Sequence, residues 1–124
     1  MDCGIPRSPK NLVFKQRHQL QGCDFSGYRF SDCEFNGADL TDTSFRGVQE
    51  MDNISFLNCT LLRTNFEGVQ FTGDLLFTGS CLKQANFRSA CLLDQPVPDS
   101  CFADASCLCG MTLPSGSTAR CPYH

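Results

Sequence analysis

Large apolar residues recur every five positions along most of this chain. Ten of its eleven phenylalanines lie on this ladder, which starts at Leu20 and resumes at Phe56 and Phe77. A period of five fits neither the 3.6-residue α-helix nor the two-residue strand. The spacing therefore predicts a backbone that repeats a turn every five residues, which is a solenoid.

The positions two before and two after each ladder residue also favour particular residue types. The residue two before it is mostly small or β-branched, as in Ala38, Thr64 and Ala85. The residue two after it is usually Gly, Asp or Asn, which tolerate the positive φ or Asx hydrogen bond of a tight corner. Four such corners close a square, so one coil takes about twenty residues, four times the repeat.

This closure predicts four inner columns if two segments have six residues instead of five. The six-residue segments are 48–53, centred on Met51, and 74–79, centred on Phe77. Every column is then apolar, as a buried core requires. The columns are Leu20/Leu40/Leu61/Leu82/Phe102, Phe25/Phe45/Phe66/Phe87, Phe30/Met51/Phe71/Leu92 and Phe35/Phe56/Phe77/Val97.

The segments resemble the pentapeptide-repeat family, most closely at 38–40, 64–66 and 85–87. The resemblance, to small cyanobacterial or chloroplast-type members, covers roughly residues 18–109. It implies an all-β, right-handed quadrilateral β-helix of about four to five coils. We expect an N-terminal cap over residues 1–17, in which Phe14 plugs the first coil, and a C-terminal cap over 110–124. Pro96 and Pro98 are expected to weaken the ladder, since each lacks a backbone donor.

Ten cysteines among 124 residues raise the question of disulfides. Cys81 and Cys101 each precede a residue of the first predicted column, so they are candidates for a bridge on the outer surface. Cys109 and Cys121 are a second candidate pair, which closes the tail. Cys23, Cys33 and Cys59 occupy small inward positions, where we expect reduced side chains.

A zinc site is the sharpest chemical alternative. Its four ligands would be Cys107, Cys109, Cys121 and His124. The indexing places Cys107 on an inward position, so core packing or a disulfide is favoured, and we predict neither a metal nor a cofactor. No Ser/His/Asp, Cys/His or paired-carboxylate arrangement stands out from the repeat, so we predict no enzymatic activity.

Seven carboxylates against two arginines make an acidic belt between positions 24 and 52. This belt is a candidate partner surface, although solvation of the repeat's Asp position explains most of it. The net charge of −3 implies no partner by itself. The acidic belt consists of Asp24, Asp32, Glu34, Asp39, Asp42, Glu50 and Asp52.

Three functions follow as hypotheses. The first is a non-enzymatic scaffold that binds a protein partner, as a monomer or weak dimer, without nucleic acid or membrane. The second, implied by the resemblance, is a DNA mimic that inhibits gyrase. The third is a disulfide- or metal-linked redox role of the C-terminal cysteines. The start Met1-Asp2-Cys3 predicts a cytoplasmic location; the alternative is a thylakoid lumen or periplasm after removal of a targeting segment.

Overall fold

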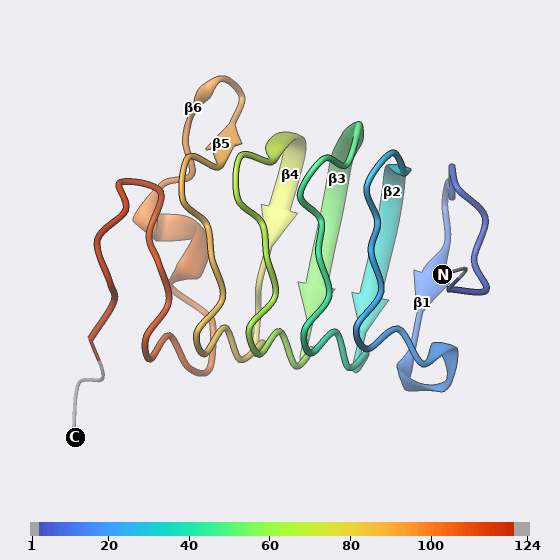
Figure 1. Ribbon diagram of the computed structural model, residues 1–124, viewed down its shortest axis with the longest axis horizontal. Helices are drawn as coiled ribbons and strands as arrows, with labels where there is room; N and C mark the ends of the chain where they lie inside the picture. The colour runs from blue at the N-terminus through green and yellow to red at the C-terminus, as the bar shows by residue number, and fades with distance from the viewer. Residues whose placement is uncertain (1–2, 121–124) are drawn as a thin grey trace.

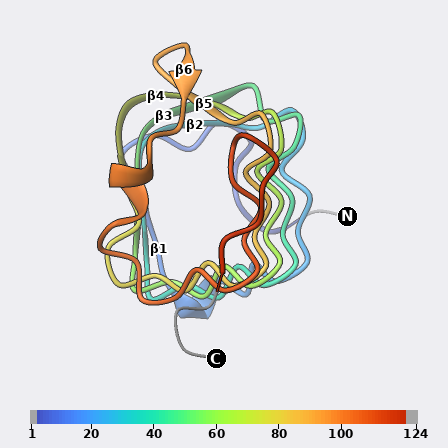
Figure 2. The ribbon, with the colours of Figure 1, turned by 90° about the vertical axis from the view of Figure 1, so that its left-hand side faces the viewer.

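The chain folds into a four-sided tower of stacked coils, shown from the side in Figure 1 and along its axis in Figure 2. This computed structural model describes residues 3–120, with the side chain of Arg17 excepted. About four turns of β-solenoid are present. Seen from the C-terminal end, the chain runs counter-clockwise as it advances toward the viewer, which is a right-handed coil (Figure 2). The predicted all-β, right-handed quadrilateral β-helix is confirmed.

Strands run along two adjacent faces of the tower, and isolated parallel bridges join the coils on the other two. The six strands lie in one sheet in chain order, all parallel except for the last pair. No helix among the described residues is long and apolar enough to span a membrane. The elements are β1 Val13–Phe14, η1 Gln16–His18, β2 Arg29–Asn36, β3 Glu50–Leu57, β4 Gln70–Leu76, β5 Cys91–Leu92, β6 Gln95–Pro96 and η2 Asp99–Phe102.

Each face is named here by its first buried ladder residue above the N-terminal segment: the Leu20, Phe25, Phe30 and Phe35 faces. On the Phe25 face, successive phenyl rings stack with centroids 4.9, 5.0 and 4.7 Å apart up to Phe87. On the Phe30 face, Phe30, Met51 and Phe71 are register partners. All four predicted columns are at most 1% exposed up to Leu82 on the Leu20 face, Phe87 on the Phe25 face, Phe71 on the Phe30 face and Phe77 on the Phe35 face. Over this range the predicted columns are confirmed.

Both six-residue segments keep the columns in phase. Phe77 remains stacked on Phe56, with centroids 5.3 Å apart. The extra residue of its segment is absorbed by a register shift between β3 and β4, where Ile54 pairs with Leu75. Such a bulge bends the strand without moving the next inward residue off its column.

At the C-terminal end of the tower, the residues on each column differ from the prediction. After Leu92 the chain leaves the coil as an antiparallel hairpin, in which Leu92 pairs with Gln95. It returns through η2, which places Phe102 on Phe77 with centroids 5.7 Å apart. Phe102 therefore ends the Phe35 column, where Val97 was predicted. The Leu20 column ends instead with Leu108, because Cys107 is the bridge partner of Cys81.

The N-terminal segment covers the first coil with a strand of its own. Val13 and Phe14 pair with Glu34 and Phe35, and the Phe14 ring stacks on Phe35 at 4.9 Å. Phe14 thus plugs the tower as predicted. A disulfide between Cys3 and Cys23, with Cα atoms 6.0 Å apart, ties this segment to the first coil. The expectation that Cys23 is reduced was wrong, because the N-terminal segment folds back to within bonding distance of it.

The C-terminal end is covered by a second fold-back. Residues 111–119 form a turn in which Thr118 lies antiparallel to Thr112. The Ala119 N–H donates to the Met111 carbonyl at 2.7 Å. The exposed edge of the last coil is therefore paired on this face, which is how solenoids prevent edge-to-edge association.

The ring stacks predict a large effect for Phe56→Ala. Phe56 is fully buried between Phe35 and Phe77, and removal of such a ring leaves a cavity in a rigid column. We expect the free energy of unfolding to fall by about 3–5 kcal/mol in urea titrations. Phe56→Leu should lose clearly less, because Leu fills equivalent positions such as Leu61. Equal losses for the two variants would contradict the stacking argument.

Candidate functional site

The hairpin of residues 91–96 is the part of the tower that departs most from the repeat, and it projects beyond the square outline of the coils (Figure 2). Its two-residue turn is Leu93-Asp94, with φ angles of 51° and 64°. Two positive φ values in a two-residue turn are the conformation that matches the twist of antiparallel strands. The Leu93 side chain is 61% exposed, the highest value among the exposed large apolar residues of the described chain.

Leucine is an unusual residue for this turn. Such positions favour Gly, Asn or Asp, and a bulky residue in the left-handed region costs about 1 kcal/mol or more. The hairpin is nevertheless held firmly. The Leu93 N–H donates to the Phe71 carbonyl at 3.0 Å, and the Val97 N–H donates to the Ala90 carbonyl at 3.2 Å. Leu93 is therefore an exposed apolar side chain on a turn whose backbone is held by hydrogen bonds to the coils.

The predicted bridge between Cys81 and Cys101 is absent, and both residues are free thiols. The bridge partner of Cys81 is Cys107, on the outside of the Leu20 face. Cys101 lies in η2, next to Phe102 on the Phe35 face. The prediction was wrong because the hairpin moves residues 99–102 back by one face.

Cys33 and Cys59 are buried and reduced, as predicted. The Cys59 thiol donates to the Phe35 carbonyl at 3.1 Å. The Cys33 thiol lies 3.4 Å from the Pro9 carbonyl. Burial raises the pKa of Cys33, and it raises that of Cys59 from 9.0 to about 11, although backbone and Ser80 hydrogen bonds oppose the shift. Both thiols act as small core side chains.

The four residues of the zinc hypothesis are placed differently from the prediction. Cys107 lies on the outward row of its face rather than on an inward position. Cys109 is disulfide-bonded. Cys121 and His124 lie outside the described residues. From residue 3 to residue 120, no group of three or more Cys, His, Asp or Glu side chains is arranged to hold a metal ion.

The acidic belt encircles the first two coils instead of gathering on one face. Asp24 lies on the Phe25 face and Asp39 on the Leu20 face, while Glu34 lies on the Phe35 face. Most of these carboxylates are held by the repeat itself. Asp42 pairs with Arg63 at 2.7 Å, which lowers its pKa, and Asp32 accepts from the Asn53 amide at 2.9 Å. Within the described chain Glu50 alone of the seven makes no such contact.

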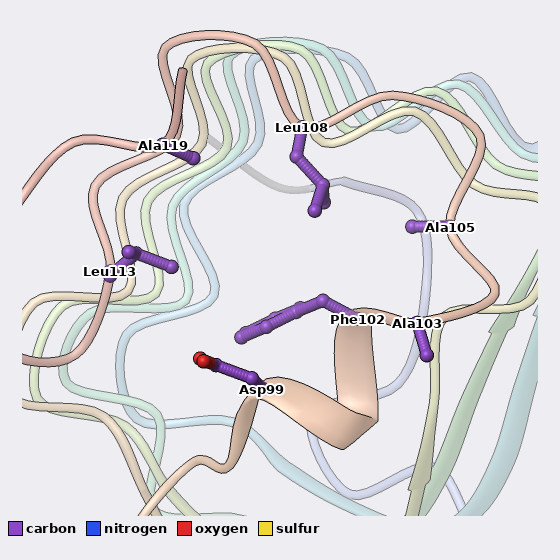
Figure 3. A pocket seen from close by; sticks show the side chains of 7 residues that line it. All are labelled: Asp99, Phe102, Ala103, Ala105, Leu108, Leu113 and Ala119. Carbon is purple, nitrogen blue, oxygen red and sulfur yellow. The ribbon is translucent and has the colours of Figure 1, made fainter. Parts of the chain in front are cut away.

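Hollows lie at both ends of the described tower, and a further one lies beside Cys107. The one near the N-terminal end is polar and is lined by Gln16, Gln19, Gln21 and Asp39. The one at the C-terminal mouth has a volume of about 380 Å³ and is mainly apolar. Phe102, Leu108 and Leu113 point into this mouth from three sides (Figure 3). Neither of the two end hollows brings together a nucleophile and a base among its lining residues.

The pKa of Cys59 predicts a loss of stability at alkaline pH. Its thiol ionises near pH 9 when unfolded but only near pH 11 when folded, so the unfolded state releases the proton first. The stabilisation is complete below about pH 9 and is lost as the pH rises toward 11, by roughly 2–3 kcal/mol. Urea titrations at several pH values should show a shallower decline for Cys59→Ala than for the wild type. Parallel declines would exclude Cys59 as the cause.

Part of the chain matches a family model of known proteins. Residues 19–49 match the family model described as pentapeptide repeats, in eight copies. No curated protein matches the chain. Among solved structures, HetL from the cyanobacterium Nostoc sp., a pentapeptide repeat protein involved in heterocyst differentiation regulation, is 19% identical with a TM-score of 0.48. The alignment covers 90% of this chain and 51% of HetL, so the chain spans about half the length of that protein. Residues 19–49 are thus similar to pentapeptide repeats, and the same five-residue columns continue through the coils above residue 49.

Proposed function

We propose that this protein is a non-enzymatic module that binds a protein partner through the 91–96 hairpin. The observation that carries the proposal is Leu93, an exposed apolar side chain at the strained tip of a projection. Apolar residues that protrude from a rigid support can enter a partner's pocket at little entropic cost. The ladder hydrogen bonds to Phe71 and Ala90 supply that support.

The other exposed apolar side chains do not form a comparable surface. Val13 and Leu76 share one row of the Phe35 face, but Glu34 and Ser55 lie between them. Single apolar residues separated by polar ones are ordinary features of a protein surface. Leu93 is also a single exposed residue, but among these described apolar residues it alone lies in the turn of the projecting hairpin, so the hairpin is the better-supported contact point.

The placement of the acidic belt argues against the DNA-mimic alternative. A DNA mimic needs carboxylates arranged along one surface with free charge, because its partner recognises a phosphate-like array. Here the carboxylates are distributed around the tower, and Asp39 and Asp52 accept hydrogen bonds from neighbouring side chains. A partner with an apolar pocket that accepts the Leu93 side chain is therefore the better-supported candidate.

The Cys3–Cys23 disulfide supports a proposal about location. Stable structural disulfides belong to oxidising compartments, and this one closes a sequence separation of 20 residues. Its stabilisation is about 3 kcal/mol by loop-closure entropy. We therefore favour the thylakoid lumen or periplasm over the cytoplasm.

Differential thiol labelling tests the location. In protein from the native source, free thiols are blocked at lysis, and disulfides are then reduced and labelled with a second reagent. We expect Cys3 and Cys23 to carry the second label in peptide mass spectra, and Cys81 to carry the first. Cys3 and Cys23 carrying the first label would place the protein in a reducing compartment.

The binding proposal predicts opposite effects of Leu93→Asn on stability and on binding. Asn suits the left-handed turn, so the free energy of unfolding should rise by up to about 1 kcal/mol. Capture of the partner from the native source should fall, because the apolar tip is removed. Leu76→Asn, which removes an exposed leucine from another face, is the matched control. Unchanged capture by Leu93→Asn, or equal loss in both variants, would refute the role of the hairpin.

A further inference from the structure

Two free cysteines are stacked on the outside of the Leu20 face. Parallel bridges join Asp39 to Thr60, Thr60 to Cys81 and Cys81 to Cys107, so these residues form one outward row along the tower. Both thiols are free and half-buried. Because their strands are parallel and in register, the two side chains leave the backbone in the same direction.

The spacing of this pair suits a bridging ion better than a disulfide. Adjacent coils of a parallel ladder lie about 4.8 Å apart. A disulfide needs Cβ atoms about 3.8 Å apart and side chains that converge. A zinc–thiolate bond is about 2.3 Å long, and two metal–sulfur bonds of that length or slightly less, arranged in a line, span about 4.3–4.6 Å. Two parallel thiols one coil apart can hold such an ion without moving the backbone.

We propose that Cys81 and Cys107 form a two-coordinate site for a soft monovalent cation, with Cu(I) as the metal that thiolate ligands select. Binding replaces two S–H bonds by two S–Cu bonds and releases two protons to solvent, with no change in oxidation state. The bis-thiolate complex carries one negative charge. Arg120 lines the same hollow as Cys107 and supplies a positive charge there.

The surroundings favour two ligands over four. Zinc requires a tetrahedral set, and the described residues bring no third Cys, His, Asp or Glu to this pair. Cys109, two positions after Cys107, is committed to a disulfide. Cys107 lines a hollow of about 320 Å³, and both thiols are only half-buried, so an ion can reach the pair from solvent.

The remaining free thiols do not reproduce this geometry. Cys33 and Cys59 point inward and donate to backbone carbonyls. Cys91 pairs with Gln70 and Pro96, and Cys101 lies in η2, so neither has a cysteine as its strand partner. The Cys81–Cys107 pair is distinct among the described free cysteines in having a thiol as its ladder neighbour.

Anaerobic titration of the full chain with Cu(I), against a chromophoric Cu(I) chelator, tests the site. We expect one tightly held ion per chain, and sulfur-only two-coordination by X-ray absorption. Cys81→Ser and Cys107→Ser should each weaken binding by more than about 100-fold, since loss of an outer-shell group alone costs 10–100-fold. Cys91→Ser and Cys101→Ser are the matched controls and should bind as the wild type does.

Two results would overturn the proposal. One is retention of wild-type Cu(I) affinity by Cys81→Ser or Cys107→Ser. The other is an equal loss of affinity in Cys91→Ser or Cys101→Ser, which would place the ion elsewhere. Thermal melts of all four variants without metal separate a binding loss from unfolding, because serine preserves the size of the side chain and both proposed ligands are only half-buried. A variant that melts as the wild type does but no longer competes with the chelator supports the site.

Discussion

The stacking of one large apolar side chain on the next, coil after coil, is the interaction on which the whole tower depends. Ring centroids 4.7–5.0 Å apart on the Phe25 face match the spacing of a parallel ladder. The backbone hydrogen bonds and the ring contacts therefore impose the same repeat distance. Neither set strains the other, and agreement between local and global preferences is what makes a sequence specify one fold.

The corners and the small inward positions both have a structural role in each coil. At the corners from Gly22 to Ser89 the backbone adopts a positive φ, for example 54° at Asn58 and 72° at Gly68. The small inward position is satisfied from within: the Thr64 hydroxyl donates to the Leu40 carbonyl at 2.9 Å, and the Ser80 hydroxyl to the Phe56 carbonyl at 2.8 Å. Inner positions and corners are thus committed to the fold, so binding must rely on outward residues or on departures from the repeat.

The sequence was sufficient to predict the columns from Leu20 to Phe87, because an inward polar residue would carry a high cost at every coil. It was insufficient at the hairpin for a specific reason. Residues on the Phe30 and Phe35 columns are normally five residues apart, but Leu92 and Phe102 are ten apart. The hairpin therefore inserts one repeat length, and the five-residue spacing continues unbroken through Val97. A periodic pattern cannot reveal an insertion equal to its own period. Pro96 and Pro98 indicated that the ladder is weakened there, but they did not indicate that the chain leaves the coil as a hairpin.

The same insertion accounts for the candidate sites. By moving residues 99–102 onto the Phe35 face, it carries Cys101 away from Cys81 and brings Cys107 next to it. It also exposes Leu93 at the tip of the projection. Because the tower below is fixed by its columns, a change of one repeat near the end alters which outward residues are neighbours without disturbing the core. In a solenoid of this kind, an insertion can change which outward side chains are neighbours while packing keeps the inward ones in place.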